Sequence, residues 1–300
     1  MESLRKGIIL AGGKGTRLSP LTNAVSKQLM SVYDKPMIYY PITTLMIAGI
    51  KEILIITNEE HQISFKRLLG DGSKWGINFE YAIQDKPNGI SEAFIIGEDF
   101  IGNSSTALIL GDNLFHGTGL IEKIIHADQN CKGATIFAYQ VRNPYDYGVV
   151  EFNEDKKVIS IEEKPKNPKS NYAVTGLYFY DKTVVERAKN IKPSSRNELE
   201  ITSLNNSYLR EGLLNVQTFG RGMAWLDTGT FDSLHEASSY IKTLENRQGL
   251  KVGCPEEIAW RRDWISDTEL VKIAKPLLKS GYGGYLKNLI KKTKNKNRFL

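Results

Sequence analysis

Cysteine is scarce in this sequence, because only Cys131 and Cys254 occur among its 300 residues. The two lie far apart, and neither has a second thiol or a histidine at the spacing that metal ligands require. We therefore expect no zinc site, and a reducing cytoplasm is the predicted compartment. A chain of this length buries roughly 75% of its unfolded surface, so it needs no crosslinks for stability.

Long hydrophobic runs are also missing. No stretch has the about 18 consecutive apolar residues of a membrane-spanning helix, and the apolar run near the N-terminus is too short for the core of a signal peptide. We therefore expect a soluble, intracellular protein without a membrane partner.

The excess of one charge is small. The 40 Lys and Arg residues are nearly balanced by 34 Asp and Glu, which leaves a net charge of +6. Much of this excess lies in a lysine-rich tail from about residue 291, whose composition is typical of a solvated chain end. Basic residues are not interleaved with aromatic ones, as a platform for nucleic acid requires. We expect no nucleic-acid partner, since a small anionic substrate accounts for the local cations.

A glycine-rich turn follows the first apolar run. The run at residues 7–10 is typical of a strand buried on both faces, and the letters AGGKGTR come directly after it. Backbone N–H groups in such a turn form a concave site for phosphate, and Arg17 and Lys27 can add positive charge. The spacing matches neither GxxxxGK[ST] nor GxGxxG, so we predict a phosphate loop of another kind. The alternative is a tight strand-to-helix turn with a solvated basic face.

Strand and helix patterns alternate through the first half. Further strands are expected at residues 53–57, 79–83, 107–110 and 134–139. Helices are expected between them at residues 34–49, 64–69, 91–100 and 119–129. This order predicts an α/β fold, with a mixed, mostly parallel central sheet, helices on both faces and a ligand crevice at the strands' carboxyl ends. Pro41 demands a kink in the first helix or a late start.

The second half is first rich in strands and then helical. Mixed strands are expected at residues 147–152, 158–162, 173–180 and 216–219. Apolar positions three or four apart predict an amphipathic helix from Phe231 to Gln248 that ends at Gly249. We expect a core over residues 1–230 and a small C-terminal helical region over residues 231–300.

Two aspartates each follow an apolar strand, more than a hundred residues apart. They are Asp112 in LILGDN and Asp227 in WLDTGT. Either one alone is commonly a turn former or a helix N-cap. Two carboxylates within ~5 Å repel by roughly 3 kcal/mol at an effective dielectric constant near 20, so their convergence calls for a divalent cation. Oxygen ligands opposite a phosphate loop predict Mg²⁺, shared with substrate phosphates.

A third polar pair ends another expected strand. Glu163 and Lys164 lie in the letters IEEKP. In the functional interpretation Glu163 accepts hydrogen bonds from a sugar, and Lys164 pairs with a phosphate on that sugar. A surface turn is the alternative.

These motifs together carry a family resemblance. AGGKGTRLSPLT, SKQL, LGDN, EEKP, NYAVTGLYFYD, ELEIT and WLDTGT closely resemble the sugar nucleotidyltransferases, over nearly all of residues 5–290. The letters GLKVGCPEEIAWR are similar to the short, tetrameric branch that transfers a thymidylyl group from dTTP to α-D-glucose 1-phosphate. The resemblance implies a Rossmann-like nucleotidyltransferase fold, a Mg²⁺-dependent reaction and a homotetramer. The products would be dTDP-glucose and pyrophosphate, in a first step toward dTDP-L-rhamnose or a related deoxysugar.

The same resemblance implies a nucleotide-binding half at about residues 1–120, a sugar-binding half at about residues 121–230, and roles for single residues. The triphosphate would be held by Gly12, Gly13, Gly15, Thr16, Arg17 and Lys27, with Gln28 beside them. The thymine would be bound by Gln84 and Gly89, and the metal by Asp112 and Asp227. The glucose and its phosphate would be bound by Gly148, Glu163, Val174, Lys164 and Arg196. Catalysis would depend on Arg17, Lys27 and Asp112.

The resemblance further implies feedback inhibition by the end product of the pathway. The inhibitor site would include residues 254–261, with Glu257 and Arg261 as candidate contacts. Plain helix packing is the alternative for this segment.

Several positions depart from the family pattern, namely Lys14, Ser91, Glu92, His116, Asn197 and Ser203. None of them removes a phosphate or metal ligand. Glu92 adds a negative charge near the nucleotide segment and could weaken binding there, while Asn197 can adopt a positive φ as glycine does.

Three other functions are weighed against this one. A UTP-dependent enzyme making UDP-glucose is the first alternative, because burying the thymine methyl contributes only about 0.8 kcal/mol. A non-catalytic sugar-nucleotide sensor is the second, although such proteins are expected to lose a metal aspartate or loop cation. A nicotinamide dehydrogenase is disfavoured by the missing glycine spacing.

Overall fold

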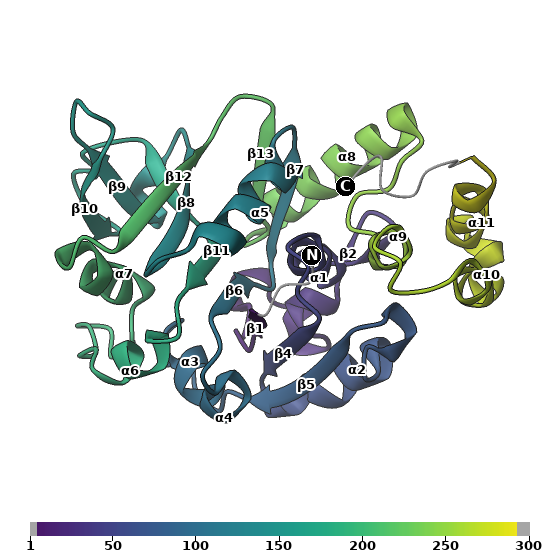
Figure 1. Cartoon of the computed structure of the whole chain (residues 1–300), viewed down its shortest axis with the longest axis horizontal. Helices are drawn as coiled ribbons and strands as arrows, with labels where there is room; N and C mark the ends of the chain where they lie inside the picture. Colours follow the sequence, from purple (N-terminus) through teal and green to yellow (C-terminus); the bar gives the residue numbers. More distant parts are fainter. Residues whose placement is uncertain (1–4, 293–300) are drawn as a thin grey trace.

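The computed structural model describes residues 5–292 (Figure 1). The lysine-rich tail, apart from its first residues, lies outside this range. No helix within residues 5–292 is long and apolar enough to cross a membrane.

The centre of the molecule is a mixed nine-stranded sheet. Four neighbouring strands of its first half run parallel in the order β6-β1-β4-β5. They are β1 (Lys6–Ala11), β4 (Glu52–Thr57), β5 (Asn78–Ile83) and β6 (Thr106–Leu110). Ile8 and Ile9 of β1 point to opposite faces and are both fully buried, so both faces of the sheet are covered. The strands predicted from the short apolar runs are confirmed.

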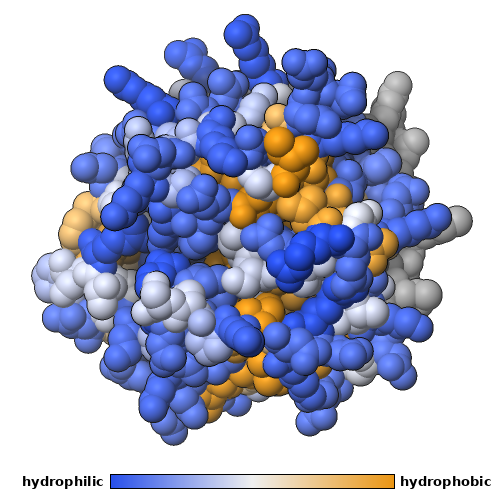
Figure 2. Space-filling view, turned by 90° about the vertical axis from the view of Figure 1, so that its left-hand side faces the viewer, coloured by the Kyte–Doolittle hydropathy of each residue, from blue (hydrophilic) through white to orange (hydrophobic). Residues whose placement is uncertain are grey.

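The long strand β11 (Tyr172–Tyr180) joins the two halves of the sheet, because it pairs antiparallel with β6, β8 and β9. The other strands of the second half are β8 (Ala134–Gln140), β9 (Gly148–Phe152), β10 (Val158–Glu163) and β12 (Leu214–Phe219). β12 runs parallel to β8, whereas β10 runs antiparallel to β9. The expected mixed extension of the sheet is thereby confirmed. The side of the molecule that lies on the left in Figure 1 is mainly hydrophilic, with separate hydrophobic patches (Figure 2).

The glycine turn leads into three short 3₁₀ helices rather than directly into an α-helix. They are η1 (Thr16–Leu18), η2 (Leu21–Asn23) and η3 (Lys27–Leu29). A small hairpin of β2 (Ser31–Val32) and β3 (Lys35–Pro36) follows, and α1 (Tyr39–Ile47) begins only after it. The predicted start of this helix at Asp34 is therefore wrong, and of the two alternatives that Pro41 allowed, the late start is confirmed. Pro41 falls in the first turn of α1, where an amide donor is not needed.

The other helices of the first half depart from prediction at their ends, and one of them is divided. They are α2 (Glu59–Leu69), α3 (Glu92–Ile96), α4 (Glu98–Ile101) and α5 (Leu120–Asn130). α2 begins earlier than predicted because Asn58 caps it by accepting a hydrogen bond from the His61 amide. The helix predicted over residues 91–100 is two short helices that meet at Gly97.

Two strands form a ribbon beside the sheet; one is the apolar strand expected before Asp227, and the other was not predicted. β7 (Asn113–Gly117) and β13 (Met223–Asp227) pair antiparallel, with Asn113 opposite Asp227. β7 follows β6 after only two residues and is partly polar, so it lacks an apolar pattern of its own.

The remaining helices are α6 (Val184–Lys189), α7 (Ile201–Arg210), α8 (Phe231–Gln248), α9 (Pro255–Arg261), α10 (Asp267–Ala274) and α11 (Tyr282–Lys292), with short 3₁₀ helices η4 (Ser73–Trp75), η5 (Pro144–Asp146) and η6 (Lys275–Ser280). α8 has the predicted bounds, with Thr230 as its N-cap and Gly249, at φ 68°, as its C-cap. α9 to α11 lie on the side of α1 and α2, away from β9 and β10 (Figure 1). The domain boundary at residue 230 coincides with the cap of α8 and stays a prediction.

Candidate functional site

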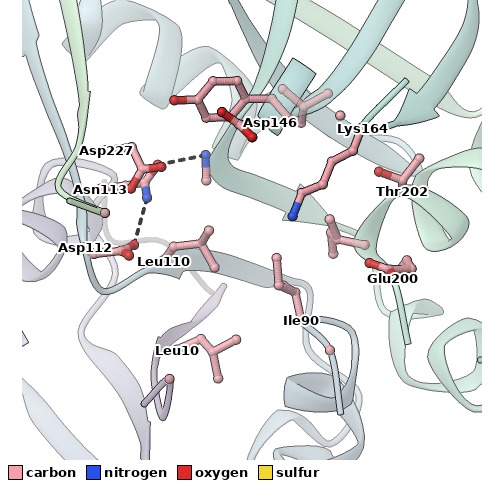
Figure 3. A pocket seen from close by; sticks show the side chains of 18 of the residues that line it. Leu10, Ile90, Leu110, Asp112, Asn113, Asp146, Lys164, Glu200, Thr202 and Asp227 are labelled. Carbon is pink, nitrogen blue, oxygen red and sulfur yellow. Dashed lines mark hydrogen bonds between the residues drawn. The ribbon is translucent and has the colours of Figure 1, made fainter. Parts of the chain in front are cut away.

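A cavity of about 730 Å³ lies at the carboxyl ends of the parallel strands, and residues from both halves of the chain line it (Figure 3). Many of the predicted site residues meet there: Gly13, Arg17, Gln84, Gly89, Asp112, Gly148, Glu163, Lys164, Val174, Arg196 and Asp227. The sheet order explains this convergence, since β1 and β6 are neighbours and β11 brings the second half alongside them. The cavity therefore lies at the edge of the sheet where the sequence analysis predicted a ligand crevice.

The glycine turn lies directly after β1, beside this cavity. A Cβ atom on Gly13 would meet no other atom within 4 Å, so backbone at this point is open to a ligand. Gly12 is more crowded, because a Cβ there would lie 3.0 Å from Gln84 Oε1. Gly15 has φ 59°, and a Cβ on it would lie 2.8 Å from the Thr22 methyl. These contacts explain why the turn uses glycine at several positions.

Lys27 and Gln28 are buried in η3, close behind the turn. Lys27 points at Asp112, with 2.5 Å between Nζ and Oδ2. Gln28 Oε1 accepts a hydrogen bond from Ser26 Oγ at 2.8 Å. Thr16 and Arg17 are exposed on η1, and Arg17 reaches past Gly229, whose added Cβ would lie 3.1 Å from its guanidinium.

The ribbon of β7 and β13 brings the two distant aspartates together. Asp112 lies just before β7, and Asp227 is the last residue of β13, paired with Asn113. The Thr228 hydroxyl donates to the Asp112 carbonyl at 3.0 Å, which ties the end of β13 to the same point. Figure 3 shows both carboxylates on one side of the cavity.

The two aspartates have different electrostatic surroundings. Burial raises the pKa of Asp112, but the Lys27 ammonium and the Asn113 amide more than offset this and hold its pKa below the ordinary value. Burial and the Asp112 carboxylate raise the pKa of Asp227 to about 6, against weaker opposing effects of Lys27 and Arg17. Ionisation is therefore unfavourable at Asp227 and favourable at Asp112.

Asn113 is a site residue that sequence analysis missed. Its Nδ2 donates to Asp112 Oδ1 at 2.9 Å. Its Oδ1 accepts from Trp225 Nε1 at 2.6 Å and from the Gly176 amide at 3.1 Å. Asn113 therefore links Asp112 to both β13 and β11. Its place in the LGDN motif, next to Asp112, was the available signal.

The side of the cavity nearest β5 holds Gln84 and Gly89. Gln84 Nε2 donates to Glu92 Oε2 at 2.8 Å and to the Gly89 carbonyl at 3.3 Å. Gly89 has φ 106°, and a Cβ on it would lie 2.5 Å from the Leu199 carbonyl oxygen. The expected weakening of nucleotide binding by Glu92 stays a prediction, and its carboxylate accepts hydrogen bonds from the Gln84 and Asn88 amides.

The opposite side holds the residues predicted for the sugar. Glu163 Oε2 accepts from the Thr202 hydroxyl at 2.5 Å, and Glu163 Oε1 lies 3.4 Å from the Arg196 guanidinium. Lys164 has φ 44° and extends into the cavity from the side opposite the aspartates (Figure 3). A Cβ on Gly148 would lie 3.1 Å from Thr202 Oγ1, so the Gly148 backbone lies close to the Thr202 side chain. Thr202 was not predicted, although it belongs to the ELEIT motif.

Arg196 lies on the same side of the cavity, beside acidic residues, and its Nη2 donates to Glu200 Oε1 at 2.8 Å. The neighbouring Asn197 has φ 60°, as its resemblance to glycine predicted. Val174 is buried in β11 beneath Gly148.

Glu257 and Arg261 lie elsewhere, on α9. Arg261 Nε donates to Glu257 Oε1 at 2.7 Å, and both residues are buried. Tyr285 also donates to Glu257. A regulatory role for these residues stays a prediction.

The family model described as nucleotidyl transferase matches residues 6–243 of this chain. The chain belongs to the nucleotidyl transferase family. A curated relative, the glucose-1-phosphate thymidylyltransferase of Neisseria meningitidis serogroup A, is 59% identical over 287 residues, which cover 96% of this chain and 100% of the relative.

Two solved structures of similar proteins complete the comparison. A Bacillus anthracis protein assigned as a glucose-1-phosphate thymidylyltransferase, in complex with sucrose, is 43% identical with a TM-score of 0.72, over 79% of this chain and 94% of that one. A UDP-glucose pyrophosphorylase in complex with UDP-glucose is 26% identical with a TM-score of 0.69, over 81% of this chain and 100% of that one.

A nucleotidyl transferase is expected to use a divalent metal, and the two aspartates fit such an ion. Residues 5–292 contain no cluster of three or more His, Cys, Asp and Glu side chains able to hold a metal. Two carboxylates nevertheless suit a hard cation that keeps water and phosphate oxygens as its other ligands. The raised pKa of Asp227 also marks a repulsion that a cation between the carboxylates would remove.

Proposed function

We propose that this protein transfers a thymidylyl group from dTTP to α-D-glucose 1-phosphate and releases pyrophosphate. The observation that carries the proposal is one cavity with the glycine turn and paired aspartates on one side and Glu163, Lys164 and Arg196 on the other. A triphosphate and a sugar phosphate need these two kinds of surface facing each other. The name of the 59% identical relative supports the same activity.

The proposed reaction needs no protein nucleophile. A phosphate oxygen of glucose 1-phosphate attacks the α-phosphorus of dTTP in line, a new P–O bond forms, and pyrophosphate leaves with the electrons of the broken bond. That oxygen is already anionic at neutral pH, so no protein base has to remove a proton. The protein contributes alignment and positive charge.

Each side of the cavity has its own part in this alignment. Backbone amides of Gly12, Gly13, Gly15 and Thr16 would bind the triphosphate, and Arg17 and Lys27 would balance the charge of the leaving pyrophosphate. Lys164 and Arg196 would bind the sugar phosphate. Glu163, held by Thr202, would accept hydrogen bonds from glucose hydroxyls.

The metal is proposed to be Mg²⁺. Asp112 and Asp227 would hold it, and when bound it would supply positive charge to the phosphate oxygens. Lys27 keeps Asp112 ionised and oriented before substrate enters, because its ammonium lies 2.5 Å from that carboxylate.

The use of UTP to make UDP-glucose is the second candidate, since a UDP-glucose pyrophosphorylase shares the fold. The two bases differ by one methyl group, whose burial contributes about 0.8 kcal/mol. A non-catalytic sensor is disfavoured, because both aspartates and both loop cations are present at the site. A homotetramer, a cytoplasmic location and feedback inhibition at α9 stay predictions.

Pyrophosphate release tests the proposal. The purified protein is incubated with glucose 1-phosphate and dTTP, UTP, dCTP or ATP, with Mg²⁺ or with a chelator. We expect the highest initial rate with dTTP, a lower but detectable rate with UTP, and no release with the chelator. A higher rate with UTP than with dTTP would favour the second candidate, and no release with any pair would refute both.

A further inference from the structure

Glu92 lies at the first position of α3, beside the part of the cavity assigned to the base. Its two carboxylate oxygens accept from two different amides. Oε2 lies 2.8 Å from Gln84 Nε2, and Oε1 lies 2.8 Å from Asn88 Nδ2. Neither the family resemblance nor the comparisons assign this residue a role.

The partners of Gln84 determine which way its amide faces. Nε2 has two hydrogens, and they are directed at Glu92 Oε2 and at the Gly89 carbonyl. Both of these groups accept hydrogen bonds and donate none. A reversed amide would place Oε1 against two acceptors, so the observed orientation follows from the chemistry of its neighbours.

The opposite atom of the amide, Gln84 Oε1, faces the glycine turn. It lies 3.0 Å from the point where a Gly12 Cβ would be, and Gln84 lines the cavity. Both hydrogens of Nε2 are already used, so a base in the cavity that contacts the Gln84 amide would meet only its acceptor, Oε1. Thymine and uracil present an N–H at N3, whereas cytosine presents an unprotonated nitrogen there.

We propose that Glu92 is a positioning residue that sets base choice, by holding Gln84 with its carbonyl oxygen toward the base so that thymine and uracil are accepted and cytosine is rejected. This inference rests on the proposed function, because it takes Gln84 to contact the base. It adds a reason for selection that the single methyl of thymine cannot supply. A site built to pair with an N–H discriminates strongly against a base that lacks it.

Replacing Glu92 with methionine tests the inference. Glu92→Met keeps an unbranched side chain of similar length but removes both acceptors, so Gln84 keeps only its longer bond to Gly89. We expect the ratio of kcat/KM for dTTP to that for dCTP to fall about tenfold. The change should come from a higher KM for dTTP, with kcat within about threefold of the unchanged protein.

Two further variants separate positioning from general effects on structure. Glu92→Gln retains one carbonyl oxygen that can accept from Gln84, so the dTTP to dCTP ratio should recover toward that of the unchanged protein. Glu98→Met is the matched control, because Glu98 is the first residue of the adjacent α4 and pairs with Lys189 on the surface. It should leave the ratio unchanged.

The outcomes distinguish this inference from the proposed function. No pyrophosphate release from dTTP by the unchanged protein would refute the proposed function itself. An active protein whose Glu92→Met variant keeps the ratio within twofold would refute the role of Glu92 alone. If that variant does not fold, the unchanged protein still tests the inference. A kcat/KM for dCTP within about tenfold of that for dTTP would overturn it.

Discussion

Lys27 and Asp112 show how single residues at this site depend on each other. Their charged atoms are 2.5 Å apart, and the Lys27 side chain is only 6% exposed. Lys27 thus has a structural partner before any substrate binds. Asp227 is half-buried, and the effects of Lys27 and Arg17 on it are weaker than those of burial and of Asp112, so its pKa is raised.

Lys27→Met is expected to lower kcat by a hundredfold or more, because positive charge at the reacting phosphates is lost. It should also lower the free energy of unfolding by about 1 to 3 kcal/mol, since Asp112 loses its ammonium partner. Steady-state kinetics and urea unfolding measure the two effects. Adding Asp112→Asn to the variant should restore part of the stability but none of the activity.

The exposed Lys14 on the same turn provides the control. Lys14→Met removes the same charge from the solvated side of the turn, so kcat should change little. Equal losses of kcat in the Lys14 and Lys27 variants would contradict a specific role for Lys27.

Asp227 predicts a pH dependence of stability in the metal-free protein. Its pKa is about 6 when folded, above the ordinary 3.8, so between about pH 4 and pH 6 the folded protein holds a proton that the unfolded chain has lost. The free energy of unfolding should therefore fall as pH rises through this window. Urea unfolding in chelator at a series of pH values measures it.

Asp227→Asn removes the titrating group and should flatten the stability profile between about pH 4 and pH 6. Added Mg²⁺ should stabilise the unchanged protein above pH 6, since a bound cation favours the ionised pair. A variant profile identical to that of the unchanged protein would show that Asp227 does not cause the pH dependence.

At the scale of elements, close backbone approaches decide how the C-terminal helices pack. The segment before α9 passes Tyr40 of α1 at Gly253, which has φ 68°, and a Cβ there would lie 2.5 Å from the Tyr40 ring. Gly249, at the end of α8, has the same φ of 68°, but a Cβ there would meet no atom within 4 Å. The two glycines therefore share backbone strain and differ in crowding.

Gly253→Ala should cost more stability than Gly249→Ala. The left-handed backbone alone costs a non-glycine residue about 1 to 2 kcal/mol at either position. Overpacking against Tyr40 should add about 1 to 3 kcal/mol at Gly253 only. Thermal and urea unfolding compare the two variants, and equal losses would show that α1 and α9 separate easily.

Across the whole molecule, a cluster of paired charges, of which Lys35 and Glu245 are buried, joins the hairpin after the glycine turn to the C-terminal region. Glu245 of α8 accepts from Lys35 at 2.7 Å and from Lys251 at 2.8 Å, and its Oε1 also accepts from the Val252 amide. Asp34 pairs with the same two lysines. Lys35 lies on the hairpin that follows η3, so the cluster connects the region of Lys27 to the segment before α9.

Glu245→Gln should lower the free energy of unfolding by about 3 kcal/mol, because buried Lys35 and half-buried Lys251 keep only the exposed Asp34 to balance them. Glu211→Gln is the control, since Glu211 is exposed where it pairs with Arg187, and a clearly smaller loss is expected there. Urea unfolding compares them. Similar losses in both variants would contradict a special role for the cluster of paired charges.

Sequence alone determined the features that arise from neighbouring residues. The parallel strands follow from short apolar runs, and the bounds of α8 follow from its apolar spacing and from Gly249. The glycine turn, Asp112, Asp227, Glu163 and Lys164 were found through motifs, because each motif is a local pattern of residue types. Propensity, capping and turn chemistry act over a few residues, so sequence carries them directly.

Tertiary structure alone decided how these local features meet. Pairing of β7 with β13 places Asp227 beside Asp112, although 115 positions separate them in the printed numbering. The Lys27 and Asp112 pair also depends on packing, and the structure decided between the kink and the late start that Pro41 allowed for α1. Only the fold shows that Glu92 accepts a hydrogen bond from Gln84, because the sequence does not show which groups surround its carboxylate. Contacts between distant segments leave no local pattern in the sequence, so only the folded structure shows which residues meet.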